Sequence, residues 1–431
     1  MAALARQAAA PLVGLAAVVL AVLNLRVIAT ELIWGSPGPG GLGEDFWSIY
    51  TPAAELPAPL YRMALEQLKN FAADPQPVAI GTYPPIDVVL ARPLTLLPWR
   101  PALAVWLAAS LVAVVVTWWL VVRLTRSGRF GAALALVIAF APDTWWAFHE
   151  GQINLLLLPV LTGAAVAAGG GRSGLAGALI GVAGALKGYP ALIGVYFLFA
   201  RDWRGMAWCF GVGAGLTAAG FLATWPASLD YLTRLLPVQL AASPGFVNHG
   251  LPAVARRYFE PNLYGTTVVA SPLLSFITGK LLPLGLVAAS LWAVRGRPAV
   301  SLLALTALLP ALTTTSWIST AVLASPALMA GLALAAGLGE AGRAGKLLLA
   351  AGALLTQLSP LLRALEVPFD SIRQAVATHD QLFYAWNLDL TAGYLCIWGG
   401  WLLVSRVARA SVSLRPGDAV PGRLAVHEAH A

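Results

Sequence analysis

The sequence predicts an all-α polytopic membrane protein with about twelve transmembrane helices and extracytoplasmic loops. Of its 431 residues, 59% are hydrophobic and 11% are charged, and the mean hydropathy is +0.76. Soluble domains carry about 25% charged residues. Apolar runs that approach the roughly 20 residues needed to cross a bilayer recur from residue 10 to residue 407. One membrane domain, residues 1–410, is therefore expected, followed by a cytoplasmic tail, 411–431, predicted to be disordered.

Glycine, proline and charged residues mark the ends of the predicted spans. The spans are expected near 10–32, 101–122, 130–147, 152–169, 174–186, 190–200, 206–224, 281–294, 299–313, 319–338, 347–360 and 392–407. The first is expected to stay as an uncleaved span. Two further apolar stretches, 86–98 and 264–279, are short and broken by proline, so they are predicted to dip into the bilayer or lie along its surface.

The distribution of charge predicts the orientation. Most arginines lie in short breaks that fit on one side, which the positive-inside rule makes the cytoplasm. This explains much of the net charge of +8, so a nucleic-acid partner is not expected. The large loops 33–100 and 225–280, and a smaller one near 361–391, then face outward. The two cysteines, Cys209 and Cys396, lie in apolar stretches and indicate neither a disulfide framework nor a metal site.

The first outer loop contains the stretch GEDFWSIYTPA, residues 43–53. Asp45 is followed by aromatic residues, which concentrate at membrane interfaces, and they are expected to hold the acid at the membrane surface. A solvated loop acid is the alternative. The segment LYRMALEQLKNFA, 60–72, has helical spacing of apolar residues and predicts an amphipathic helix, either at the interface or packed on the spans. In TYPPIDVVLARPLTLLPW, 82–99, Tyr83 precedes two prolines and belongs either to a rigid loop or to the wall of a headgroup site.

Another outer connection, WWAFHEGQIN at 145–154, groups four polar residues. His149 and Gln152 offer the donors and acceptors that suit sugar hydroxyls. Asn154 does so too, although helix capping is an alternative role for it.

Residues 174–200 form an apolar run interrupted by LKGYP. Each half, of about 13 residues, is roughly 20 Å long as a helix, so we expect a broken hairpin that lines a cavity or is buried in protein. Its glycines at four-residue spacing predict close helix packing. Lys187 at the break is predicted to hold an anion, with snorkelling to the headgroups as the alternative. Arg256 and Arg257 add two cations on the same side, and together the three are candidates for holding a phosphate.

These motifs resemble glycosyltransferase family 87, membrane enzymes of the GT-C fold. The resemblance rests on EDFWSIY with Asp45, YPPIDVVLARPLTLLPW, GQIN with Asn154, LKGYP with Lys187, and NHGLPAVARR with Asn248 and Arg257. It implies an inverting transferase that moves a hexose, with mannose as the first candidate, from a polyprenyl-phosphate donor to a glycan or glycolipid acceptor. It further implies a multi-pass plasma-membrane (inner-membrane) protein with an extracytoplasmic site and no metal or other cofactor.

Within that resemblance, Asp45 is the expected catalytic base, with Glu44 as a substitute. Lys187, Arg256 and Arg257 would bind the donor phosphate. The residues expected to contact substrate are Tyr83, His149, Gln152, Asn154, Asn248 and His249.

The chain departs from the family pattern at TTTSWISTAV, 313–322, where Ile318 and Ser319 replace the expected paired histidines after Trp317. Either His149 or His249 takes their place, or the donor or acceptor differs. Two other functions remain open: a transporter or flippase for lipid-linked sugars, because broken helices and an intramembrane lysine also mark transport pathways, or a non-catalytic homologue that binds lipid-linked sugar.

Overall fold

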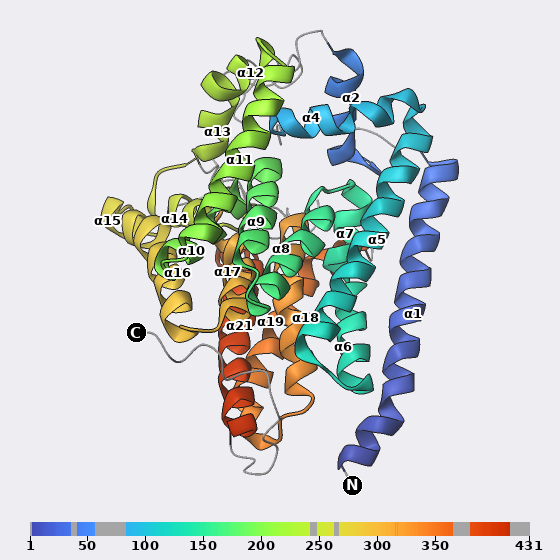
Figure 1. Ribbon diagram of the computed structural model, residues 1–431, viewed down its shortest axis with the longest axis vertical. Helices are drawn as coiled ribbons and strands as arrows, with labels where there is room; N and C mark the ends of the chain where they lie inside the picture. Colours follow the sequence, from blue (N-terminus) through green and yellow to red (C-terminus); the bar gives the residue numbers. More distant parts are fainter. Residues whose placement is uncertain are drawn as a thin grey trace.

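The computed structural model describes residues 2–35, 41–56, 83–241, 248–262, 267–314, 316, 318–364 and 380–413. Every regular element in these ranges is a helix (Figure 1). The structure therefore agrees with the prediction of an all-α membrane protein.

The helices follow one another without any long described loop. The first half contains α1 (Ala2–Trp34), α2 (Glu44–Glu55), α4 (Pro85–Ala91), η1 (Arg92–Leu96), α5 (Trp99–Thr125), α6 (Arg129–Ala139), α7 (Pro142–Glu150), α8 (Asn154–Gly169), α9 (Ser173–Lys187), η2 (Tyr189–Gly194), α10 (Val195–Phe199) and α11 (Trp203–Ala223). The second half contains α12 (Ala227–Asp230), η3 (Tyr231–Leu235), α13 (Leu236–Leu240), α14 (Leu251–Phe259), α15 (Pro272–Phe276), η4 (Ile277–Leu281), α16 (Leu282–Ala293), α17 (Pro298–Leu312), η5 (Ile318–Ala324), α18 (Ser325–Ala335), η6 (Glu340–Gly342), α19 (Arg343–Ala364) and α21 (Asp380–Ser413).

Five helices in the described ranges are long and apolar enough to cross a membrane: Ala8–Trp34, Trp99–Thr125, Trp203–Ala223, Pro272–Ala293 and Leu390–Ala408. A sixth span results if α6 and α7, which bend by 41° at their junction, are counted together. Each of the twelve predicted spans falls on a helix or on two consecutive short helices. The count of twelve crossings is not confirmed, because several of these helices are shorter than a bilayer; α17, with 15 residues, is about 22 Å long.

The core is formed by the short helices together with the long helices α5 and α21, whereas α1 and α11 are mostly exposed. Residues Ser301–Ala311 of α17 are all buried, and α8 packs against α5, α9 and α17. By contrast, only 11% of the most apolar window of α1 is buried, and α1 runs along one flank of the bundle (Figure 1). Exposed apolar side chains such as Leu12 and Leu15 on this helix are expected where lipid is the solvent.

The broken hairpin is confirmed in its local structure. Helix α9 ends at Lys187, Gly188 turns the chain with a φ of +73°, and η2 and α10 continue it. The predicted close packing is confirmed as well: a Cβ on Gly177 would lie 2.0 Å from the carbonyl oxygen of Gly205 in α11. A Cβ on Gly181 would lie 2.4 Å from the carbonyl oxygen of Cys209, so only glycine allows these two helices to approach so closely.

The span predicted at 281–294 begins earlier than expected. Residues Pro272–Ala293 form one membrane-length helical segment, so part of the stretch 264–279 belongs to a span and not to the second outer loop. Within this segment Gly279 is a packing position, where an added Cβ would lie 3.0 Å from the Cβ of Ala255 in α14.

Three predictions fall outside the described residues. These are the amphipathic helix at 60–72, residues 365–379 of the third outer loop, and the tail beyond residue 413.

Candidate functional site

Helix α2, which carries Asp45, is held against the turn that follows α7. It begins after Gly43, whose φ is +81° and whose amide donates to the carbonyl oxygen of His149 at 2.7 Å. Gly151 in the turn has a φ of +67°, and a Cβ there would lie 3.0 Å from the Cβ of Phe46. Residues other than glycine rarely adopt these positive φ values, so this pair of glycines allows α2 to approach the turn.

Aromatic residues fix α2 on the protein. Phe46 is fully buried, and its ring stacks on Trp99 at 5.3 Å and on Trp106 at 4.7 Å. Tyr50 donates to the carbonyl oxygen of Leu97 at 2.8 Å. The ring of Phe46 is enclosed by the start of α5, so it holds α2 by packing against the protein. Packing of α2 against the protein therefore positions Asp45.

Asp45 lies in the first turn of α2, where the helix dipole favours a carboxylate. The side-chain amide of Gln152 donates to its Oδ2. Burial raises the pKa of Asp45 above its ordinary value, and the nearby Lys187 ammonium partly offsets this effect. Its neighbour Glu44 is exposed. Of the two acids, Asp45 is thus the one directed into the protein.

Gln152 connects Asp45 to a second carboxylate. The same amide nitrogen that contacts Asp45 lies 3.4 Å from Oε2 of Glu150, and Trp146 donates to Oε1 of Glu150 at 2.5 Å. Within the described residues, the carbonyl oxygen of the Gln152 side chain has no hydrogen-bond partner. Glu150 is the fourth polar residue of the WWAFHEGQIN stretch, and the sequence indicated no particular role for it.

Lys187 joins this group from the end of α9. Its ammonium lies 4.2 Å from the centre of the Tyr83 ring, a cation–π contact. It interacts electrostatically with three carboxylates, Asp45, Asp87 and Glu150. Among the described residues it donates no hydrogen bond and has no ion pair within 4.0 Å, which leaves its N–H groups available to a ligand.

Tyr83 is buried, with 3% of its surface exposed. Burial raises the pKa of its phenol well above the ordinary value, and the charge of Asp45 raises it further. Tyr83, Gln152, Lys187 and Asp45, which are far apart in the sequence, therefore meet in one cluster, as their proposed roles require.

Asp87 is the residue of this cluster that sequence analysis missed. It is 3% exposed and lies in α4, beside α2 at the same end of the bundle (Figure 1). Burial raises its pKa well above the ordinary value, and Lys187 lowers it. The signal was a single carboxylate inside the apolar stretch PPIDVVLA.

Asn154 is the first residue of α8. It is buried, accepts a hydrogen bond from the Tyr189 hydroxyl at 2.8 Å, and donates to the carbonyl oxygen of Ser319 at 3.3 Å. It makes no side-chain cap on α8. Asn154 thus connects α8 to η2 and to η5, and it fixes Tyr189 two residues after Lys187.

His149 points to α1. Its Nε2 lies 3.0 Å from Oε2 of Glu31, and its ring stacks on Trp146 at 5.5 Å. Its contribution to α2 comes from its backbone carbonyl, as described above.

Asn248, His249 and Arg257 form a second group around the loop between α17 and η5. Asn248 is 1% exposed; its side chain donates to the carbonyl oxygen of Thr314 at 2.7 Å and accepts from the amide of Ser316 at 2.9 Å. The His249 amide donates to the carbonyl oxygen of Ser316 at 2.8 Å. Arg257 is fully buried and donates to the carbonyl oxygen of Asn248 at 2.6 Å.

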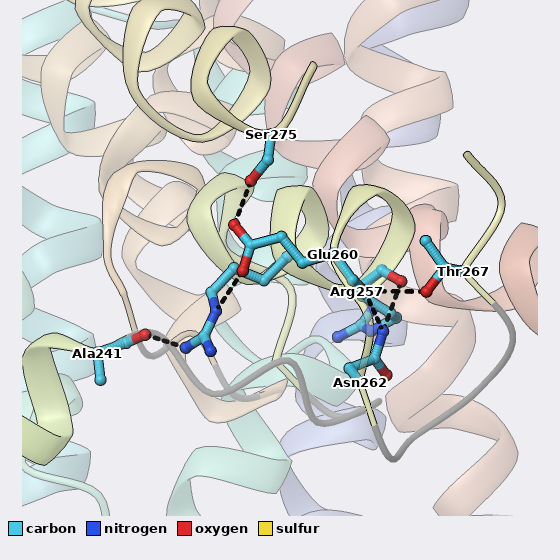
Figure 2. Close-up of polar contacts among 7 residues, drawn as sticks. Ala241, Arg257, Glu260, Asn262, Thr267 and Ser275 are labelled. Atoms are coloured by element: carbon cyan, nitrogen blue, oxygen red, sulfur yellow. Dashed lines mark hydrogen bonds and ion pairs between the residues drawn. The ribbon is translucent and has the colours of Figure 1, made fainter. Parts of the chain in front are cut away.

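Arg256 pairs with Glu260, which belongs to a polar network at the end of α14 (Figure 2). Its Nε lies 3.2 Å from Oε2 of Glu260, whose other oxygen accepts from the Ser275 hydroxyl at 2.6 Å. Figure 2 shows that Asn262 and Thr267 close the network through the backbone of Glu260 and Arg257. In Figure 1, α14 lies apart from α2 and α4, so the structure does not group the two arginines with Asp45 as the sequence had led us to expect.

The departure near residue 317 is described only in part. Trp317 and the side chain of Ile318 lie outside the described residues. Ser319 is buried, and its carbonyl oxygen accepts from Asn154 as noted above. Ser319, one of the two positions where the resemblance led us to expect histidine, therefore contacts α8 through its backbone.

One cavity among the described residues lies elsewhere. It has a volume of about 760 Å³ and is lined by Thr125, Arg126 and neighbouring residues at the far end of α5 from Trp99. At 1.5 Å per residue the two ends of α5 are about 40 Å apart, so this cavity is separate from the Asp45 cluster. No group of three metal-ligating side chains occurs in the part of the chain that the structure describes.

The fold and the site together define an all-helical membrane protein with a partly buried acid, amide groups and a lysine gathered at one end of its helix bundle. The family model for glycosyltransferase family 87 matches residues 82–326, and the chain belongs to this family. The match includes Tyr83, Gln152 and Lys187, while Asp45 precedes it.

Two relatives resemble the chain. Both are described as polyprenol-phosphate-mannose-dependent alpha-(1-2)-phosphatidylinositol pentamannoside mannosyltransferases. The protein of Mycolicibacterium smegmatis is 29% identical over 217 residues, which cover 48% of this chain and 50% of the relative. The protein of Mycobacterium tuberculosis is 30% identical over 230 residues, which cover 51% of each. The chain thus spans about half the length of the curated relatives it matches.

Proposed function

We propose that this protein is an inverting membrane glycosyltransferase that moves a hexose from a polyprenyl-phosphate donor to a glycan or glycolipid acceptor. Mannose is the first candidate sugar, since both relatives are named for polyprenol-phosphate-mannose. The observation that carries the proposal is the Asp45 carboxylate, held by Gln152 and placed within electrostatic range of Lys187. We place this site on the extracytoplasmic side of the plasma membrane, following the positive-inside rule.

In the proposed reaction, Asp45 accepts the proton of an acceptor hydroxyl while that oxygen attacks the anomeric carbon. The new C–O bond forms on the face opposite the lipid phosphate, and the bond from the anomeric carbon to the phosphate oxygen breaks with its electron pair. The phosphate leaves with its own charge and needs no proton. A single displacement of this kind inverts the configuration of the sugar, and general-base help typically contributes about 10² to 10⁴ in rate.

Lys187 is the first candidate to stabilise the departing phosphate, because its N–H groups have no acceptor among the described residues. Arg256 and Arg257 come second, because Glu260 and Asn248 already engage them. For the acceptor side, Tyr83 and Gln152 stand beside Asp45, whereas Asn154, Asn248, His149 and His249 act by holding the surrounding helices.

The test uses purified full-length protein in lipid nanodiscs, supplied with a panel of radiolabelled polyprenyl-phosphate sugars and a phosphatidylinositol mannoside. Asp45→Asn is expected to lower turnover by about 10² to 10⁴, because the amide keeps the shape of the carboxylate but cannot accept the proton. Glu44→Gln is the matched control, since Glu44 is the adjacent acid but is exposed.

Full turnover by Asp45→Asn would contradict the mechanism. Wild-type protein that binds these lipids without transferring sugar would instead support the non-catalytic homologue, and movement of labelled lipid across a bilayer without transfer would support the flippase.

A further inference from the structure

Asp87 is buried but lacks the contacts that normally accompany a buried carboxylate. Only 3% of its surface is exposed, and neither of its carboxylate oxygens has a hydrogen-bond partner among the described residues. Buried polar groups in folded proteins are almost always hydrogen-bonded, and each exception requires an explanation.

A second buried aspartate in the same chain shows the usual arrangement. Asp143 is 1% exposed; its Oδ1 accepts from the amide of Thr144 at 2.8 Å and its Oδ2 from the Ser325 hydroxyl at 3.0 Å. Asp143 thus ties α7 to α18, whereas Asp87 ties α4 to nothing by hydrogen bonds in the described structure.

The position of Asp87 is nevertheless fixed by packing. Helix α4 lies against α2, α9 and α11, and Gly220 of α11 approaches it so closely that an added Cβ would lie 2.5 Å from the backbone nitrogen of Ile86. The charge of Asp87 acts on Lys187 and on the Tyr83 phenol. Asp87 is therefore held rigidly next to the two residues that stand beside Asp45.

We infer that Asp87 binds hydroxyl groups of a hexose at the Asp45 site. The sugar hydroxyls would donate hydrogen bonds to the two carboxyl oxygens, which accept none from the described residues. A carboxyl group suits neighbouring sugar hydroxyls because it offers two oxygens with several acceptor directions. The hexose is either the one carried by the donor or the one at the end of the acceptor. This inference rests on the proposed function.

The experiment compares binding of two lipids, polyprenyl-phosphate-mannose and polyprenyl phosphate without sugar, to the full-length protein in nanodiscs. Asp87→Ala is expected to weaken binding of the sugar-bearing lipid by about ten- to a hundredfold, the range for a hydrogen bond to a charged group, and to leave binding of the bare lipid phosphate unchanged. If the acceptor supplies the hexose, both lipids bind normally and the KM for a phosphatidylinositol mannoside rises by a similar factor. Either result supports the inference.

Asp143→Ala is the matched control, because it removes a buried carboxylate that is already hydrogen-bonded. It is expected to lower the melting temperature without discriminating between the two lipids. Asp87→Ala is expected to leave the melting temperature of the unliganded protein unchanged or to raise it, since it removes a buried carboxylate that has no hydrogen-bond partner among the described residues.

The inference is overturned if Asp87→Ala affects both lipids equally and lowers the melting temperature as Asp143→Ala does, or if it changes neither lipid binding nor the acceptor KM. Failure of the proposed function is a separate result, because it is read from turnover by the wild-type protein, whereas the role of Asp87 is read from the difference between two lipids.

Discussion

Replacement of Gly151 by alanine tests whether the contact between α2 and the turn at residue 151 positions Asp45. Gly151 has a φ of +67°, and its missing Cβ would lie 3.0 Å from the Cβ of Phe46 and 3.2 Å from the Cα of Gly43. The substitution therefore strains the backbone of the turn and also moves the start of α2.

The backbone strain lowers stability, and the displacement of α2 lowers the rate. A left-handed conformation costs a residue with a Cβ about 1–2 kcal/mol. Carbon atoms pack best at about 3.5–4.0 Å, so α2 is expected to move by roughly 0.5–1 Å to relieve the contact with Phe46. A displacement of about 1 Å at a reacting group can lower the rate about a hundredfold, so kcat is expected to fall between about 10- and 100-fold.

The assay measures sugar transfer and melting temperature on the same nanodisc sample. Gly171→Ala is the control: Gly171 also has a positive φ, +72°, but nothing lies within 4 Å of its missing Cβ. Both variants should lose stability through the strained turn, Gly151→Ala more because of its contact with Phe46, and only Gly151→Ala should lose turnover. Normal turnover in Gly151→Ala, or an equal loss in Gly171→Ala, would refute the positioning argument.

Three further predictions concern pH, packing and charge. Because burial raises the pKa of Asp45, activity should decline with falling pH at a higher pH than the ordinary aspartate value of about 3.9 implies; Lys187→Met removes the cation that lowers this pKa and should move the decline to still higher pH. Gly177→Ala places a Cβ 2.0 Å from a carbonyl oxygen of α11 and should lower the free energy of unfolding by about 1–3 kcal/mol, measured by thermal melting. Arg256→Ala removes a partly exposed ion pair, worth about 0–1 kcal/mol, and should raise the donor KM less than Lys187→Met does.

Each of these has a result that contradicts it. An acid decline that stays in place in Lys187→Met would show that Lys187 does not act on Asp45. Gly211→Ala, on α11 with nothing within 4 Å of the added Cβ, is the packing control, and an equal effect of both alanines would reject the α9–α11 argument. A larger rise in donor KM for Arg256→Ala than for Lys187→Met would place the phosphate at α14.

The membrane character of the chain and the rough positions of its helices could be read from the sequence. A bilayer interior imposes the same local demand everywhere, namely a run of apolar residues that satisfies its own backbone hydrogen bonds. The break at LKGYP was predictable for a similar local reason, since Gly188 adopts a positive φ and Pro190 cannot donate a backbone hydrogen bond. Asp45 and Lys187 also stood out, because charges are rare in such a sequence.

The arrangement of the polar residues was decided by the tertiary structure. Gln152 contacts Asp45 although the two residues are 107 positions apart in the chain. Asp87 lies near Lys187, and the only cue to this in the sequence was a single acid in an apolar stretch. The arginines of α14 looked equally suited to the site in sequence but lie in a separate network. Local sequence patterns indicate how each residue interacts with lipid, water and its own helix. Contacts between helices depend instead on packing details, such as the missing Cβ atoms of Gly151 and Gly220, which matter only once the helices are assembled.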